Sequence, residues 1–432
     1  MSIADWRPQN YAPVPDPTFV AYLHALRPGV LRWPAGHRSQ EYVWERGGGG
    51  QSGGFTLTAS HVAAFLALAK TVGAEPVFAI NVKRSTPSVA ADIVKYLNVE
   101  NGHGVRFFQI GNEPDLTDGM TSGPAAYAAQ LIAFVDAMRA VDPAIRIVGP
   151  ELLTGAHVGG MHGTVDWMTP ILAQTGGRID GISWHYYPLD SGQRLPTSSA
   201  IVSIPHLFQQ TASDWAPAGM SFVDTVMPAL GAMRDAHALG ASIWITELAE
   251  DPGPAAGAGV SDTIAAALWT ADTLGRYGEY APGAVLRWIF ETVPEHAYGL
   301  LDGAHAPRPT YGAYWLYARH MGDRFVDVES SSSTAVAAHA ALRADGALTV
   351  VFVNKTEVAK TVHLTLDGFC ASAAEARTLT GASLSSTSFQ IDGQTLTASS
   401  AEAGLPGVPV ALKDLGELEI PPASIRMVSY RP

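Results

Sequence analysis

The stretch VRFFQIGNEPD, residues 105–115, joins an apolar run to a glutamate at the point where the run ends. The run has the length of a buried strand, and a helical pattern over residues 124–141 follows it. A strand followed by a helix is the repeating unit of parallel α/β folds. Pro114 biases the backbone of Glu113 toward extended geometry, so we expect this carboxylate at the exit of the strand.

The same alternation of strand and helix recurs up to residue 322. The other strand candidates are residues 2–6, 29–36, 75–81, 145–151, 181–187, 242–247 and 284–290. The other helical candidates are residues 17–26, 60–72, 89–97, 165–174, 222–239, 262–277 and 311–321. Eight such units predict an α/β fold, a (β/α)₈ TIM barrel. A doubly wound sheet is the alternative, but no G-x-G-x-x-G follows the early strands.

After residue 322 apolar and polar residues alternate, which is typical of antiparallel strands. The dipeptides Asp345-Gly346 and Asp392-Gly393 have the composition of tight hairpin turns. Residues 1–322 are therefore predicted to form the barrel, and residues 323–432 a C-terminal β-sandwich domain. The N-terminal residues could add a strand to this sandwich.

The composition excludes several classes of protein. A net charge of −13 over 432 residues argues against a nucleic-acid partner, because phosphates are bound by clustered lysine and arginine. Cys370, the one cysteine, excludes an internal disulfide. No apolar run is long enough for a membrane helix, and no signal peptide is visible, which leaves the compartment open. We expect a monomer without cofactor or metal, since His157 and His162 lack a third ligand.

The carboxyl ends of barrel strands hold the active site in this fold, so glutamates at strand ends are the candidates for chemistry. They are Glu113, Glu151, Glu247 and Glu291. Two carboxylates facing each other are what glycoside hydrolysis requires, about 5 Å apart for retention of configuration and about 6.5–9.5 Å for inversion. Asn112 places an amide beside Glu113, and such an amide can hydrogen-bond a sugar hydroxyl. Glu151 and Glu291 have no such neighbour, so we expect them to support the structure.

Three tryptophans also lie on or near strand ends: Trp33, Trp184 and Trp288. An indole in such a place can stack on a sugar ring, and it can equally belong to the apolar core.

Two motifs resemble clan A of the retaining glycoside hydrolases. They are IGNEP at residues 110–114 and WITE at residues 244–247. VLRWPAG (30–36), WHYY (184–187), SDT (261–263) and AYGLLD (297–302) narrow the resemblance to glycoside hydrolase family 79, the heparanases and β-glucuronidases, in a bacterial-type form. The sandwich segments LTVVFVN and IPPASIRMVSY extend it over nearly the whole chain.

Carried over to this chain, the resemblance implies roles for several residues. Glu113 would be the general acid/base and Glu247 the nucleophile. Asn112 would bind the 2-hydroxyl of the sugar, Tyr187 would hydrogen-bond the nucleophile, and His185 would line the pocket.

The resemblance also implies a site for the uronic acid carboxylate. Tyr298 would contact this group, and the backbone of Gly257 and Gly259 in the loop DPGPAAGAG (251–259) would hold it. The loop departs from the family pattern, because it is one residue longer and has no adjacent pair of glycines.

The function implied is a retaining β-glucuronidase of heparanase type, acting by double displacement. Its partner would be a saccharide that contains glucuronic acid, either a heparan-sulfate-like chain or a simpler β-glucuronide. The alternatives are another clan A glycosidase, such as an arabinofuranosidase or xylosidase, and a non-catalytic carbohydrate-binding protein. The presence of both glutamates argues against the last.

Overall fold

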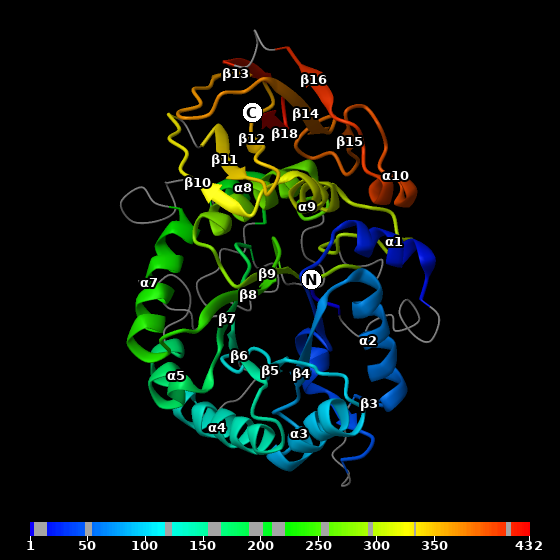
Figure 1. The fold of residues 1–432 in the computed structure, drawn as a ribbon, viewed down its shortest axis with the longest axis vertical. Coiled ribbons are helices and arrows are strands. Elements are labelled where there is room, and N and C mark those ends of the chain that lie inside the picture. Colours follow the sequence, from blue (N-terminus) through cyan, green and yellow to red (C-terminus); the bar gives the residue numbers. More distant parts are fainter. Residues whose placement is uncertain are drawn as a thin grey trace.

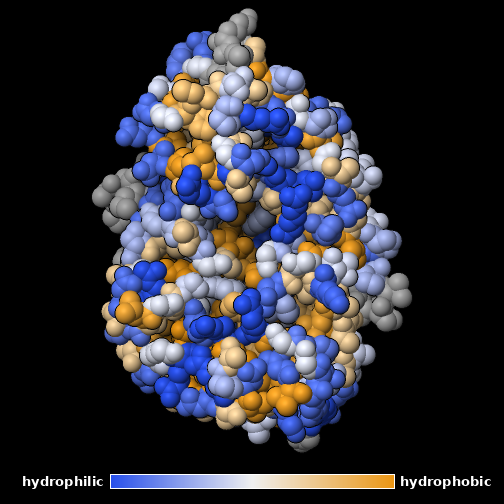
Figure 2. All heavy atoms as spheres, viewed as in Figure 1, coloured by the Kyte–Doolittle hydropathy of each residue, from blue (hydrophilic) through white to orange (hydrophobic). Residues whose placement is uncertain are grey.

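The computed structural model describes residues 1–3, 15–47, 54–116, 123–153, 166–189, 202–209, 221–251, 259–292, 297–331, 334–411 and 416–432. Gly257, His157 and His162 lie outside these ranges, as do residues 4–6 of the first predicted strand. Figure 1 shows a ring of helices around a wall of strands, with a smaller β-rich part beyond α8 and α9. Hydrophilic residues cover most of the same face, with apolar residues between them (Figure 2).

Seven parallel strands form the wall of the barrel, in the order β1-β4-β5-β6-β7-β8-β9. Their bounds are β1 Val30–Trp33, β4 Glu75–Ile80, β5 Phe107–Ile110, β6 Arg146–Leu152, β7 Gly181–Tyr186, β8 Ser242–Leu248 and β9 Ala284–Arg287. Seven of the eight predicted strands are thus confirmed, and the predicted barrel with them, since successive strands lie side by side with a crossover between them.

Residues 1–3 connect the first and last of these strands. The amide of Ile3 donates to the carbonyl of Arg32, and the amide of Ser2 to the carbonyl of Arg287, both at 3.0 Å. Ser2 also forms a parallel bridge with Arg32. The N-terminal residues that the structure describes therefore belong to the barrel wall, and they add no strand to the sandwich.

Helices surround this wall (Figure 1). Their bounds are α1 Pro17–Ala25, α2 Ala59–Val72, α3 Pro87–Val94, α4 Pro124–Val141, α5 Met168–Thr175, α6 Ile204–Gln209, α7 Phe222–His237, α8 Ile264–Glu279 and α9 Pro309–His320. Four begin with proline, whose missing N–H has no helical partner to lose there. Thr58 and His61 cap α2 reciprocally, and Gly73 ends it in left-handed geometry. Among the described helices, none has the length and apolarity that crossing a membrane requires.

Short elements join β1 to α2 and extend α3. A 3₁₀ turn covers Gly36–Gln40, the parallel pair β2 Tyr42–Trp44 and β3 Phe55–Leu57 follows it, and a π-helical segment covers Lys95–Glu100. The 3₁₀ turn lies directly after β1 and therefore at the carboxyl ends of the strands.

Antiparallel strands form the C-terminal part. One sheet has the order β10-β11-β12-β18-β14-β15 with β16 on β14, and β13 pairs with β17. Their bounds are β10 Arg324–Val326, β11 Val336–Leu342, β12 Leu348–Asn354, β13 Lys360–His363, β14 Ala373–Thr380, β15 Gln390–Ile391, β16 Val408–Val410, β17 Glu417–Ile420 and β18 Ser424–Arg431, and α10 Ala398–Ala403 lies among them. Asp392 and Gly393 have φ of +51° and +74°, as a tight hairpin turn requires.

A buried ion cluster joins the two parts where α8 and α9 pack on β11, β12 and β18. Asp272 of α8 accepts from Nζ of Lys355 at 2.8 Å and lies 3.0 Å from Nε2 of His339. Burial alone would raise the pKa of Asp272, but Lys355, Arg276 and His339 outweigh it and hold the pKa well below its ordinary value. The carboxylate is thus ionised and bound to both parts of the chain.

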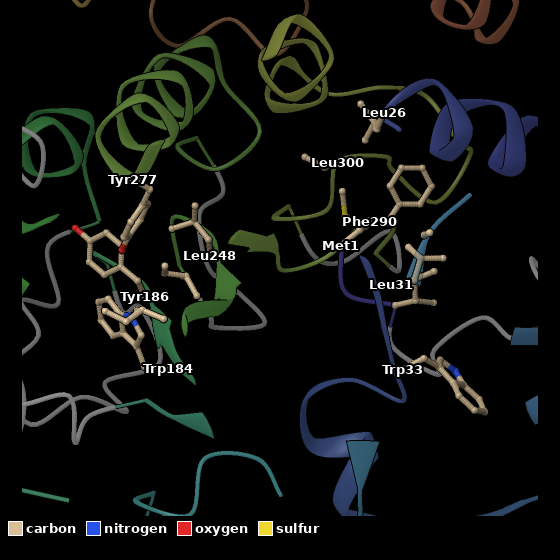
Figure 3. Packing of buried hydrophobic residues seen from close by; sticks show 14 of the residues in the cluster. Met1, Leu26, Leu31, Trp33, Trp184, Tyr186, Leu248, Tyr277, Phe290 and Leu300 are labelled. Carbon is tan, nitrogen blue, oxygen red and sulfur yellow. The ribbon is translucent and has the colours of Figure 1, made fainter. Parts of the chain in front are cut away.

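The core contains two of the three tryptophans singled out above. Trp33 is fully buried and stacks on Phe65 with ring centroids 5.0 Å apart. Trp184 stacks on Tyr186 at 5.7 Å, and Figure 3 shows both side chains near Tyr277. Both indoles therefore pack in the core.

Candidate active site

The carboxyl ends of neighbouring strands bring the predicted residues together. Glu113 follows β5, His185 lies in β7 and Glu247 in β8, and all three are buried. An oxygen of Glu113, an oxygen of Glu247 and a ring nitrogen of His185 all lie within 4.8 Å of one another. The two glutamates of the sequence prediction therefore share one pocket.

Each oxygen of Glu247 has its own donor. Nη1 of Arg32 donates to Oε1 at 2.7 Å, and the hydroxyl of Tyr187 donates to Oε2. Burial, and then the charge of Glu247, raises the pKa of Tyr187 well above its ordinary value, so the phenol keeps its proton. Glu247 is thus fixed in orientation by a guanidinium and a phenol.

Arg32 was not singled out in the sequence, although it is central to the site. It is fully buried in β1, and its Nη2 donates to Oδ1 of Asn112 at 2.8 Å and to Oε2 of Glu151 at 3.3 Å. Its Nε donates to the side chain of Gln109. The available signal was a basic residue inside an apolar strand, since a buried cation needs an ion partner.

His185 lies between three carboxylates. Nδ1 is 2.8 Å from Oε1 of Glu113 and 3.5 Å from Oε2 of Glu247, and Nε2 is 3.1 Å from Oε2 of Glu151. Burial alone would lower the pKa of His185, but Glu247, Glu113 and Glu151 outweigh burial and raise it to about 10. Both ring nitrogens therefore carry protons at neutral pH and donate them to carboxylates.

Glu151 supports the site from behind, in agreement with the supporting role expected for it. It is fully buried, and its Oε2 also accepts from Oγ1 of Thr246 at 2.9 Å. Burial alone would raise the pKa of Glu151, but Arg32 and His185 outweigh it and lower the pKa, so the carboxylate is ionised. Glu291, the fourth candidate, lies 3.2 Å from Nε2 of His305 instead.

The backbone of Glu113 differs from the prediction. Its φ is +45°, in the left-handed region, and not the extended geometry that Pro114 favours. The amide of Glu113 donates to the carbonyl of Glu151 at 2.8 Å, so a bond between neighbouring strands fixes this geometry against the local preference. Such backbone strain costs about 1–3 kcal/mol and is typical of functional positions.

Asn112 retains an unused donor. Its Oδ1 accepts from Arg32 and its backbone carbonyl accepts from the side chain of Gln40. Its Nδ2 is buried and has no hydrogen-bond partner among the described residues. A buried donor without a partner is costly, so this N–H₂ suits a ligand hydroxyl.

An apolar cluster includes Tyr187, the donor to Glu247. It consists of Ala35, Leu116, Leu153, Tyr187, Ala249, Trp288, Ile289 and Tyr298. The indole of Trp288 lies against Gly36, where a Cβ would come within 2.3 Å of the ring. Trp288 and Tyr298 therefore share a cluster with Tyr187, whereas Trp33 and Trp184 belong to the main core.

A second buried ion pair contacts this cluster. Arg287 donates to Glu250 at 2.8 and 2.7 Å and to the carbonyl of Tyr298 at 2.6 Å. The pair was not predicted, because the partners come from neighbouring strands.

The described glycine of the loop, Gly259, shows no contact with the site residues. Gly259 has φ of +85°, and a Cβ there would meet nothing within 4 Å. Its backbone conformation explains the glycine. Gly257 lies outside the described residues, so the carboxylate-binding role of both stays a prediction.

Solved structures of glycosidases share this fold. A GH51 arabinofuranosidase from Xanthomonas axonopodis pv. citri has a TM-score of 0.70 at 17% identity, over 99% of this chain and 92% of that one. A xyloglucanase of family 44 from Paenibacillus polymyxa has a TM-score of 0.68 at 15% identity, over 95% and 94%. CelM2, a bifunctional glucanase-xylanase from a metagenome library, has a TM-score of 0.66 at 18% identity, over 95% and 94%.

No protein-family model and no curated protein matches this sequence. The structural likeness therefore shows the fold, a TIM barrel with a C-terminal β domain, over almost the whole length of the chain.

Proposed function

We propose that this chain is a retaining glycoside hydrolase with Glu113 as acid/base and Glu247 as nucleophile. One observation carries the proposal, namely that an oxygen of Glu113 lies within 4.8 Å of an oxygen of Glu247. Retention requires carboxyl groups about 5 Å apart, whereas inversion needs about 6.5–9.5 Å to admit a water between them.

The proposed mechanism has two steps. Glu247 attacks the anomeric carbon while Glu113 gives its proton to the leaving oxygen, so that the glycosidic bond breaks and a glycosyl ester forms. Glu113, now a carboxylate, takes a proton from a water whose oxygen attacks the same carbon, and Glu247 is released. Arg32 and Tyr187 hold Glu247 in line for both attacks.

An arabinofuranoside is the first candidate substrate. Arabinofuranosidases share the fold over nearly the whole chain. The arginines of the site also favour a neutral sugar, because Arg32 is paired with Glu247 and Glu151, and Arg287 with Glu250. Neither cation is left to bind a carboxylate on the substrate.

A β-glucuronide is the second candidate, and Tyr298 favours it. Tyr298 belongs to the same apolar cluster as Tyr187. Its sequence position is the one at which the resemblance to family 79 implies a contact with the uronate. A phenol is a neutral donor, so it can bind a substrate carboxylate without neutralising the nucleophile.

A panel of 4-nitrophenyl glycosides tests both candidates: the α-L-arabinofuranoside, the β-D-xyloside and the β-D-glucuronide. The arabinofuranoside is expected to be cleaved fastest, and NMR of the first product formed should show retention. A preference for the glucuronide would favour the second candidate. Cleavage of none, together with binding to polysaccharides, would indicate a non-catalytic protein.

Glu247→Ala identifies the nucleophile. The variant should lose turnover, and azide should restore part of it by forming a glycosyl azide of inverted configuration. Glu291→Ala is the matched control, since Glu291 also ends a strand but contacts His305. Full activity of Glu247→Ala would refute the assignment.

A further inference from the structure

Three potential ligand atoms, of Glu113, His185 and Glu247, all lie within 4.8 Å of one another. Nδ1 of His185 lies 2.8 Å from Oε1 of Glu113 and 3.5 Å from Oε2 of Glu247. Ligands about 2.1 Å from a metal ion are about 2.9 Å apart at octahedral angles and about 3.4 Å apart at tetrahedral angles. Small shifts of the side chains would therefore place all three atoms around one ion.

The other nitrogen of His185 has the contact that metal-ligating histidines make. Nε2 lies 3.1 Å from Oε2 of Glu151, which also accepts from Thr246 at 2.9 Å. A carboxylate on the far side of a histidine fixes the ring and leaves the near nitrogen to the metal. Here that near nitrogen is Nδ1, which faces Glu113 and Glu247.

The charges of the site suit a divalent cation. Binding of the ion would release the proton on Nδ1 of His185 and the acid proton of Glu113. Glu113, Glu151 and Glu247 would then carry three negative charges against one positive charge on Arg32. The buried remainder of two negative charges would be cancelled by one divalent ion.

The other buried histidine with two carboxylates lacks this geometry. Nδ1 of His339 contacts Glu279 at 2.7 Å, and its Nε2 contacts Asp272 at 3.0 Å. Each nitrogen thus faces a different carboxylate, so no single ion could bind both. Among the described residues, Glu113, His185 and Glu247 are the group that converges.

We propose that Glu113, His185 and Glu247 form a binding site for a divalent transition-metal ion of the Zn²⁺ type, which acts as an inhibitor. The ion would occupy the space between the two carboxylates that the glycosidic oxygen and the anomeric carbon need. Binding itself is independent of the proposed function, and only the inhibition rests on it.

Calorimetric titration of the full chain with Zn²⁺ alone tests the site. The wild type is expected to bind one ion, and both His185→Asn and Glu113→Gln should weaken binding at least tenfold while circular dichroism shows them folded. Glu417→Gln is the matched control, since Glu417 and His363 form an exposed pair 3.7 Å apart. Unchanged affinity in His185→Asn and Glu113→Gln would overturn the inference, because the ion would then bind elsewhere.

Kinetics separate this inference from the proposed function. If both hold, Zn²⁺ raises KM for the aryl glycoside without changing kcat, and a chelator reverses the effect. Binding of Zn²⁺ without hydrolysis of any glycoside would leave the metal site and refute the hydrolase. Hydrolysis unaffected by saturating Zn²⁺ would leave the hydrolase and refute the metal site.

Discussion

Tyr187→Phe removes one hydroxyl from the site and little else. In the wild type this hydroxyl donates to Oε2 of Glu247, and the ring lies among Leu116, Leu153, Ala249 and other apolar side chains. A phenyl ring fills the same space, so we expect the fold to be kept. What changes is that Glu247 loses one of its two donors.

The size of the effect follows from the kind of bond that is lost. A hydrogen bond to a charged group contributes about 1.5–3 kcal/mol. If Tyr187 must orient Glu247 for attack, kcat/KM should fall by about 10- to 150-fold, since about 1.4 kcal/mol corresponds to a factor of ten. Initial rates on the preferred 4-nitrophenyl glycoside measure this loss.

Tyr186→Phe is the matched control, since Tyr186 is the neighbouring residue and ends β7. Its side chain packs with Trp184 and Tyr277 in the core (Figure 3). Its hydroxyl is buried and has no hydrogen-bond partner in the part of the chain that the structure describes. We expect its kcat/KM to stay within about twofold of wild type. Wild-type rates in Tyr187→Phe, or equal losses in both variants, would refute the reasoning.

Three further variants test the surroundings of the site and the ion cluster that joins the two parts of the chain. Glu151→Gln removes one of the carboxylates that raise the pKa of His185 to about 10. The imidazole should therefore lose its proton at lower pH than in the wild type, which ¹⁵N NMR measures. An unchanged midpoint would contradict this. Lys355→Met breaks a buried ion pair with Asp272, and the free energy of unfolding measured in urea should fall by about 3 kcal/mol. This is the lower end of the range for a broken buried pair, because Asp272 keeps its contacts with Arg276 and His339. A loss below about 1 kcal/mol would contradict the prediction. Gly36→Ala would place a methyl group 2.3 Å from the indole of Trp288, at a residue whose φ is +61°. The free energy of unfolding should fall by about 2–4 kcal/mol, from backbone strain and overpacking. A wild-type melting temperature would contradict this.

The fold could be predicted because its signals are local. The helix predicted over residues 124–141 is α4, Pro124–Val141, since a proline start and an apolar periodicity lie within one segment. The turn at Asp392-Gly393 likewise depends on two residues that adopt positive φ. Such features need no knowledge of distant contacts.

The contacts of Arg32 and the backbone of Glu113 could not be predicted, because they depend on strand register. Arg32 reaches Glu247 and Asn112 only when β1, β5 and β8 stand around one barrel. The left-handed backbone of Glu113 likewise results from a bond to Glu151 on the next strand, against the preference that the following proline imposes. Sequence spacing contains neither contact.

The surroundings of the two glutamates distinguish their roles without reference to motifs. Both oxygens of Glu247 accept hydrogen bonds, from the guanidinium of Arg32 and from the phenol of Tyr187, and these donors hold the side chain in one orientation, which suits a nucleophile. Oε2 of Glu113 lies 3.8 Å from Nε2 of His37, whose side chain is 38% exposed. An acid/base gives up one proton and takes one back from the attacking water in each catalytic cycle, so a carboxyl group with an exposed neighbour suits this role. The asymmetry of contacts and of access therefore supports the proposed roles, proton transfer by Glu113 and covalent attack by Glu247.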